Sequence, residues 1–248
     1  MDPTKRFSNR VESYIRYRPD YPPTVIELLQ QDYGLSAEDE LADMGAGVGH
    51  TAKLFAPHVG YIYAIEPNEE MNLALQQQMK HVPNFSARLR PAENTDLEAR
   101  SVDFIICGQS YHWFNQKMAR TEFERILNDE GYVVLMWNSR DRTSDFGRAY
   151  EQFLLDHGVD YTEVNHAKVG EEQFDYLMRS WKRYEFENHQ VLDAEGLIGR
   201  FTSSSYAPAP GSEPHQQATQ VLSQIFEEFA EAGQLRMDYV TEVIVGKI

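Results

Sequence analysis

The most informative part of the chain reads Leu41-Ala42-Asp43-Met44-Gly45-Ala46-Gly47-Val48-Gly49-His50. It begins as a short hydrophobic strand that includes the acidic Asp43, and it continues through three glycines at alternate positions into an amphipathic helix. Glycine has no Cβ and takes positive φ without penalty, so a turn of this kind lets the backbone approach a ligand closely. The stretch therefore predicts a strand, a tight turn and a helix with a ligand beside the turn.

A second acidic residue follows the next strand. The apolar run 61–65 ends at Glu66, and an acidic side chain at the end of the second strand can accept hydrogen bonds from both hydroxyls of a ribose. Because parallel strands end at the same edge of a sheet, the glycine turn and Glu66 are expected to lie together. They indicate a nucleoside-binding site.

The spacing of the glycines indicates which nucleoside is bound. A dinucleotide-binding turn reads G-x-G-x-x-G and places a pyrophosphate at the start of its helix. Here Gly49 comes one place early, and His50 occupies the position that the dinucleotide pattern needs. Asp43 would repel a pyrophosphate but suits a cationic ligand group. A glycine turn without any ligand is the plainer alternative.

The order of motifs along the whole chain resembles a known enzyme family. The glycine turn and Glu66-Pro67 are followed by Pro91-Ala92-Glu93 and by GQSYHWF at 108–114. The run LNDEGYVVLMWNSRD then occupies 127–141, and YIRYRPDYP lies within the N-terminal segment 7–22. This order resembles the class I (Rossmann-like) S-adenosyl-L-methionine (SAM)-dependent methyltransferases of the small-molecule type, which include the trans-aconitate methyltransferase-like enzymes. The resemblance covers residues 7–142 and is diffuse beyond them, where such enzymes vary their substrate pockets.

The resemblance implies a set of contacts to SAM. Asp43 would bind the cationic amino group, directly or through water, and Glu66 would bind the ribose hydroxyls. The backbone of Gly45, Ala46 and Gly47 would serve the amino acid end. The other positions that the resemblance assigns to the cofactor are Tyr14, Arg18, Pro67, Met71, Ala92, Glu93, Gln109 and Ser110.

Several of these positions have plainer interpretations. Asp43 could cap the following helix, and Met71 could belong to the core of its own helix. Tyr14 and Arg18 could lie on an ordinary surface helix. The sequence leaves these alternatives open.

The methyl acceptor is expected near His112 and Trp113. A histidine here could act as a general base, because its unperturbed pKa of about 6.5 suits proton removal at neutral pH. It could equally orient the loop, and a carboxylate acceptor would need no base at all. Arg140, and Arg200 with Tyr206, could bind an anionic acceptor through hydrogen bonds that the guanidinium groups donate, although each arginine alone could be a solvated surface residue. No metal site is expected, because the histidines lack metal-ligand spacing and no cysteine pair accompanies them.

Composition favours one enzyme domain over residues 1–248. The chain has 248 residues, of which 42% are hydrophobic, and a net charge of −16 that disfavours nucleic acid as a partner. No apolar segment is long enough for a membrane span, and residues 1–6 lack the apolar part of a secretory signal. The single cysteine, Cys107, cannot form an internal disulfide, so we expect a cytoplasmic location. We expect the protein to be a monomer or a homodimer. Residues 1–22 are predicted to form a lid segment, and insertions at about 140–215 to cover the substrate.

Strands and helices alternate along the first part of the chain. This pattern predicts an α/β fold: a doubly wound, mostly parallel seven-stranded sheet with an antiparallel last strand and helices on both faces. A fifth strand is expected from Tyr132 after a turn at 128–131, and helical or irregular cover is expected over 159–180. A helix should start at Asp193 as its N-cap. The other expected elements are helices near 22–33, 49–57, 68–80, 115–127, 144–157 and 213–231, and strands at 184–192 and 236–246.

The resemblance thus implies methyl transfer from SAM to a small molecule, and we expect the methylated atom to be a carboxylate oxygen. Two other functions remain open at this stage. One is a SAM- or nucleoside-binding regulatory protein without transferase activity. The other is a nicotinamide-dependent oxidoreductase, which His50 and Asp43 disfavour.

Overall fold

A computed structural model describes residues 10–162 and 169–248. Some predicted features lie outside the described residues. They are Phe7 with the rest of the start of the lid segment, and part of the cover predicted at 159–180. The described chain forms two compact units. The glycine-loop unit comprises residues 20–137, 169–186 and 241–248, and the helical unit comprises residues 10–19, 138–162 and 187–240.

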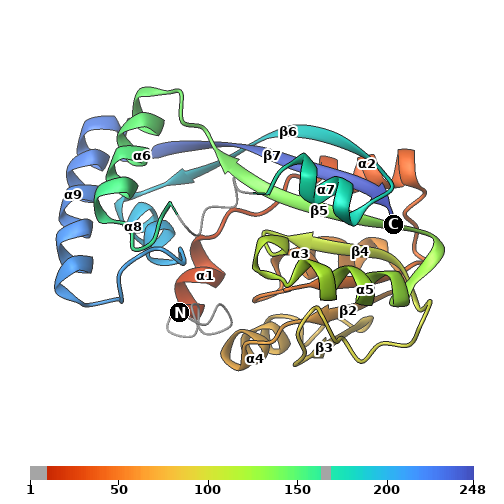
Figure 1. Ribbon diagram of the computed structural model, residues 1–248. Helices are drawn as coiled ribbons and strands as arrows, with labels where there is room; N and C mark the ends of the chain where they lie inside the picture. Colours follow the sequence, from red (N-terminus) through yellow and green to blue (C-terminus); the bar gives the residue numbers. More distant parts are fainter. Residues whose placement is uncertain (1–9, 163–168) are drawn as a thin grey trace. The chain divides into compact units, whose positions relative to one another are not determined.

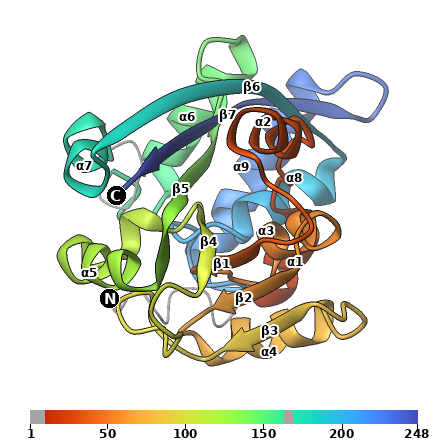
Figure 2. The same cartoon turned by 90° about the vertical axis from the view of Figure 1, so that its right-hand side faces the viewer.

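Seven strands form one mixed sheet in the order β3-β2-β1-β4-β5-β7-β6 (Figure 2). Strands β1 to β5 pair in parallel where their registers are defined. Strand β7 lies between β5 and β6 and runs antiparallel to the parallel strands. The predicted fold class is therefore confirmed. The strands are β1 (Glu40–Met44), β2 (Tyr61–Ile65), β3 (Phe85–Arg88), β4 (Val102–Gly108), β5 (Leu127–Arg140), β6 (Ser180–Leu192) and β7 (Leu235–Lys247).

Helices cover both faces of the strands in the glycine-loop unit. Successive side chains of a strand point to opposite faces, so Leu41 packs in one apolar cluster and Ala42 in another. The first cluster includes residues of α2 (Thr24–Tyr33), α3 (His50–Phe55) and α4 (Glu69–Gln78), and the second those of α5 (Gln116–Ile126) and α7 (Glu171–Leu177). Strands that are apolar on both faces are expected of a parallel sheet buried between helices.

The helical unit has its own apolar core. Helices α6 (Asp145–His157), α8 (Ala194–Thr202) and α9 (Glu213–Phe229) pack together, and α1 (Val11–Tyr17) contacts α8 (Figure 1). The side chain of Asp193 accepts a hydrogen bond from the amide of Gly196, so the predicted N-cap of α8 is confirmed. Capping satisfies an amide that has no partner within its own helix.

Two predicted boundaries were wrong. The segment 128–131 was expected to be a turn before the fifth strand, but β5 begins at Leu127 and includes it. The register shifts there, because Val102 of β4 pairs with Leu127 whereas Phe104 pairs with Tyr132. A bulge thus absorbs the polar residues that resemble a turn. Within the predicted cover, residues 171–177 form helix α7, and β6 already begins at Ser180 rather than at residue 184.

The described residues contain no helix with the length and apolarity that crossing a membrane requires.

Candidate cofactor and acceptor sites

The glycine turn follows β1 and is held against the end of β2. Gly45, Gly47 and Gly49 have φ values of +70°, +58° and +99°, which glycine adopts without strain. The amides of Gly45 and Ala46 donate to the carbonyl of Ile65 at 2.8 and 3.0 Å. These amides are therefore already engaged within the protein. A ligand would meet the surface of the turn rather than these two N–H groups.

Gly45 also allows the turn to pass close to the end of β4. A Cβ at this position would lie 2.6 Å from the Cβ of Ser110. The hydroxyl of Ser110 donates to the carbonyl of Met44 at 2.5 Å, which ties the two loops together. The neighbouring residue Gln109 has a φ of +59°, and its amide donates to the carbonyl of Met136 at 2.9 Å. Left-handed backbone at a non-glycine residue is costly and concentrates at functional sites.

Glu66 is buried and oriented by two backbone amides. One carboxylate oxygen accepts from Gly47 at 2.8 Å, and the other accepts from Asn68 at 2.8 Å. A carboxylate has about four acceptor positions, so the two bonds leave acceptor capacity for a ligand hydroxyl pair. Burial raises the pKa of Glu66, and the two amides oppose that rise.

Asp43 is a carboxyl group in β1 that is fully buried. Neither of its oxygens has a partner with full hydrogen-bond geometry among the described residues, but the backbone amide of Ala52, in the first turn of α3, interacts with it and lowers its pKa. Burial outweighs this amide and, with a smaller contribution from the charge of Glu66, raises the pKa of Asp43 to about 8. The interaction with Ala52 agrees with the alternative role of Asp43 as a cap of α3, which stays open. A carboxylate has about four acceptor positions, so a cationic ligand group also suits this side chain.

The remaining predicted residues of the glycine-loop unit follow the strands β2, β3 and β4. Met71 is buried near the start of α4, and Glu93 accepts a hydrogen bond from the amide of Asn115 at 2.7 Å. His112 and Trp113 lie in the short 3-10 helix Tyr111–Trp113, with ring centroids 4.7 Å apart. Pro67 is half-buried and Ala92 is buried.

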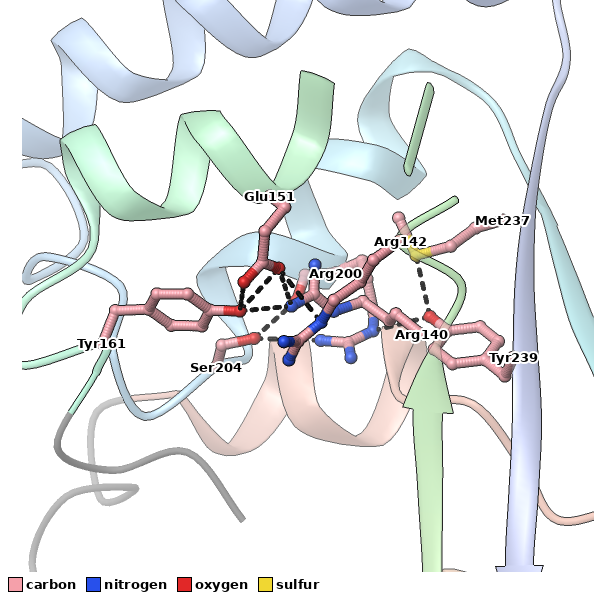
Figure 3. A network of polar contacts seen from close by, with 8 residues as sticks. All are labelled: Arg140, Arg142, Glu151, Tyr161, Arg200, Ser204, Met237 and Tyr239. Carbon is pink, nitrogen blue, oxygen red and sulfur yellow. Dashed lines mark hydrogen bonds and ion pairs between the residues drawn. The ribbon is translucent and has the colours of Figure 1, made fainter. Parts of the chain in front are cut away.

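The helical unit contains arginines from separate segments, and two of them, Arg140 and Arg142, form ion pairs with Glu151 (Figure 3). Arg140 donates to Glu151 at 3.2 Å and to the hydroxyl of Tyr161 at 2.8 Å, and that hydroxyl donates in turn to Glu151. Arg200 donates to the hydroxyls of Tyr239 at 3.1 Å and Ser204 at 2.9 Å. The side chain of Arg140 is 9% exposed and Arg200 is 4% exposed, so neither is a solvated surface arginine.

Arg18 and Tyr206 belong to the same cluster. Arg18 donates to the carbonyl of Ser203 at 3.0 Å, and its guanidinium lies over the ring of Tyr14, 4.7 Å from the centroid. Burial acts to raise the pKa of Tyr206, but Arg140, Arg200 and Arg18 outweigh it and lower the pKa. Tyr14 and Arg18 are both half-buried, so neither is a fully exposed residue of a surface helix.

The predicted residues thus fall into two groups. One group surrounds the glycine turn in the glycine-loop unit, and the other, with Tyr14, Arg18, Arg140, Arg200 and Tyr206, lies in the helical unit. Sequence reasoning missed the residues that contact the second group, which are Tyr150, Glu151, Tyr161 and Tyr239. No local motif marks them, because they come together only through the packing of α6, α8 and β7.

Comparisons with known proteins agree with the glycine-loop geometry. Residues 42–135 match the family described as "Methyltransferase domain". The chain is 28% identical over 239 residues to an uncharacterized methyltransferase of Schizosaccharomyces pombe, covering 89% of this chain and 88% of the relative.

Two solved structures share the fold. A putative type II methyltransferase from Anaeromyxobacter dehalogenans matches with a TM-score of 0.68 at 18% identity, over 93% of this chain and 98% of the other. Geranyl diphosphate C-methyltransferase from Streptomyces coelicolor, solved with S-adenosyl-L-homocysteine, matches with a TM-score of 0.51 at 10% identity, over 91% and 76% of the two chains.

The match of residues 42–135 to the methyltransferase domain, together with the fold, supports a class I SAM-dependent methyltransferase with SAM as its cofactor. The residues present fit this cofactor on their own geometry. Asp43 offers a buried carboxyl group for a cationic amino group, and Glu66 offers oriented acceptors for a ribose.

Replacing Glu66 by alanine should weaken SAM binding at least about tenfold, because each hydrogen bond to a charged group contributes about 1.5–3 kcal/mol. Glu66→Gln is the matched control. It keeps the size of the side chain and one acceptor oxygen, so its dissociation constant should lie between those of the alanine variant and the wild type. Calorimetry with SAM measures all three proteins, with thermal unfolding to verify the fold. An unchanged dissociation constant for Glu66→Ala would exclude the ribose contact.

Proposed function

We propose that this protein transfers the methyl group of SAM to an oxygen of a small molecule, and that the acceptor group is a carboxylate. The observation that carries the proposal is the arginine cluster of the helical unit. Guanidinium groups bind carboxylates through strong, directional, charge-assisted hydrogen bonds, and Arg18, Arg140 and Arg200 gather there. An acid of the trans-aconitate type is the specific form of acceptor that the sequence resemblance suggests.

The charge of the chain supports a local binding site rather than long-range attraction. A net charge of −16 repels nucleic acid and also opposes the approach of a small anion. Buried arginines would compensate for this at short range, where interactions are weakly screened by salt. The same charge argues against nucleic acid as the acceptor.

Each proposed residue has one task in this reaction. SAM supplies a methyl group activated by its sulfonium, so the protein mainly has to align donor and acceptor and exclude water. Asp43 would hold the amino group and Glu66 the ribose, while Gln109 and Ser110 would contact the methionine part. A carboxylate is already ionised, so His112 would position the acceptor with Trp113 and would act as a base only for a neutral hydroxyl.

The further proposed cofactor contacts complete the arrangement. Pro67 and Met71 would line the adenine, and Ala92 and Glu93 would meet its edge. For Tyr14 and Arg18, which belong to the helical unit, the cofactor contact stays a prediction of the resemblance.

The test is release of S-adenosyl-L-homocysteine from SAM with a panel of carboxylic acids and their matching primary amides. We expect release with at least one acid and none with its amide, because the amide lacks the ionised oxygen. Release only with amines or neutral hydroxyl compounds would contradict carboxylate methylation while leaving methyl transfer intact. Tight SAM binding without release for any compound would favour the regulatory alternative.

A further inference from the structure

The loop between β3 and β4 carries two of the proposed cofactor contacts. Residues 89–101 contain Ala92 and Glu93 and form neither a helix nor a strand. Inside the loop, the amide of Asn94 donates to the carbonyl of Pro91 at 3.1 Å. A segment without ladder hydrogen bonds is easily displaced. The position of Ala92 and Glu93 therefore depends on what the loop contacts.

Helix α5 holds this loop at two points. One carboxylate oxygen of Glu93 accepts from the amide of Asn115, the N-cap residue of α5, at 2.7 Å. Farther along the helix, the amide and the hydroxyl of Thr95 both donate to Oε1 of Glu122, at 2.8 and 2.5 Å. The second point is the stronger one, because hydrogen bonds to an ionised group are about twice as strong as neutral ones.

Glu122 is a buried carboxylate that is fully engaged. It is 7% exposed, and Nε and Nη2 of Arg125 donate to its two oxygens, both at 2.8 Å. Burial acts to raise the pKa of Glu122, but Arg125 and Thr95 outweigh it and lower the pKa. The Arg125 side chain is 40% exposed, and the Glu122 side chain contacts the loop on its buried side. Glu122 thus joins α5 to Thr95.

The hydrogen bonds at Thr95 also fix the local conformation of the loop. Thr95 is fully buried, and its hydroxyl accepts from the amide of Leu97 at 3.3 Å while it donates to Glu122. The residue between them, Asp96, has a φ of +61°. Left-handed backbone at a non-glycine residue persists only where the surroundings hold it. Here the bonds to Thr95 hold it, close in sequence to the proposed adenine contacts.

We propose that Glu122 is a positioning residue of the cofactor site, which holds Thr95 and thereby sets the preference of Ala92 and Glu93 for adenine. The inference rests on the proposed function, because the adenine contacts belong to it. One oxygen of Glu93 is used on Asn115, which leaves the other to accept from the exocyclic amine, and the amide of Ala92 donates to a ring nitrogen. Hydrogen bonds weaken steeply when their geometry is lost, so displacement of the loop affects both contacts.

Hypoxanthine is the base that tests these contacts. In hypoxanthine a carbonyl oxygen replaces the exocyclic amine, and the neighbouring ring nitrogen carries a hydrogen. The edge of the base then presents an acceptor to the Glu93 carboxylate and a donor to the Ala92 amide. A site built to hydrogen-bond one pattern rejects the other, because its own polar groups are left unpaired. A displaced loop contacts neither base and should bind both alike.

The experiment measures the ratio of two affinities in the full chain. S-adenosyl-L-homocysteine and its hypoxanthine counterpart, S-inosyl-L-homocysteine, are titrated calorimetrically, and thermal unfolding verifies the fold of each variant. The wild type should bind the adenine ligand at least about tenfold more tightly. In Glu122→Gln one amide oxygen has to serve the donors of Thr95 while the amide nitrogen faces Arg125, so the ratio should fall about fivefold or more.

A second pair of variants acts from the loop side. Thr95→Val removes the hydroxyl and should also lower the ratio, and Thr95→Ser restores the hydroxyl and should keep the ratio of the wild type. Lower stability alone would weaken both ligands equally and leave the ratio unchanged.

Glu124→Gln is the matched control on the same helix. The Glu124 side chain is 44% exposed and pairs with Arg120 at 3.1 Å, without a recorded bond to the loop among the described residues. Its ratio should equal that of the wild type. A wild-type ratio in folded Glu122→Gln and Thr95→Val, or an equal fall in Glu124→Gln, would overturn the inference.

The failure of this inference differs from the failure of the proposed function. Equal and tight binding of both ligands by the wild type would refute the adenine contacts and the inference with them. Discrimination by the wild type that survives in Glu122→Gln and Thr95→Val would refute the positioning role alone. Neither result involves the methyl acceptor, which the release of S-adenosyl-L-homocysteine tests separately.

Discussion

Replacing Gly47 by valine should abolish SAM binding while the protein remains folded. Gly47 has a φ of +58°, a conformation that a β-branched residue adopts only at considerable cost. Its amide donates to Glu66 at 2.8 Å, so any shift of the turn also releases the carboxylate that is proposed to hold the ribose. The change therefore acts on the turn and on Glu66 at once. Calorimetry at high SAM concentration should detect no binding.

A matched variant separates backbone strain from damage to the site. Gly233 also has positive φ, +78°, and a Cβ there would meet no atom within 4 Å. Gly233→Val should therefore carry similar strain, visible as a lower unfolding temperature, and bind SAM like the wild type. Normal SAM binding by folded Gly47→Val would show that this turn does not approach the cofactor.

The parts of the site that could be predicted are those whose structure is determined by a few neighbouring residues in the sequence. Positive φ at alternate positions requires glycine, so the turn at 45–49 is visible in the sequence, and strand-end acids such as Asp43 and Glu66 stand next to apolar runs. The same locality explains why the helices α2 to α6 match their predicted ranges within a few residues. Periodicity and capping residues act over a few positions only.

What could not be predicted depends on packing between distant segments. Nothing near Arg140 or Arg200 in the sequence shows that both become buried, since a surface arginine has the same local pattern. Tyr150 and Glu151 reach the cluster because they are neighbours on α6, a relation that matters only after α6 packs in the helical unit. The bulge at 127–131 is a similar case, because polar residues there predict a turn and only pairing with β4 makes them a strand.

SAM binding should depend strongly on pH because of Asp43, whose pKa is raised by burial to about 8. At pH 7 about nine-tenths of the ligand-free protein carries this proton. A cationic amino group favours the ionised form, so SAM binding should release close to one proton, and affinity should rise up to about tenfold per unit between about pH 6 and 7.5. Calorimetry in buffers of different ionisation enthalpy measures the released proton. No net release would contradict the assignment of Asp43 to the amino group.

Asp43→Asn should weaken SAM binding at least about 100-fold, because removing one partner of a buried ion pair costs about 3–5 kcal/mol.

The stability of the ligand-free wild type provides an independent measurement of the Asp43 carboxyl group. The folded pKa is above the ordinary value of 3.8, so the native state holds the proton between about pH 4 and 8 and the unfolded state does not. The contribution of protonated Asp43 to the free energy of unfolding is complete below pH 4. It is lost as the pH rises, by up to about 1.4 kcal/mol per pH unit. Thermal unfolding across this range should show that fall in the wild type and a flatter profile in Asp43→Asn, whose side chain does not titrate. Identical profiles would show that Asp43 ionises normally, and a cationic ligand would then gain nothing from its burial.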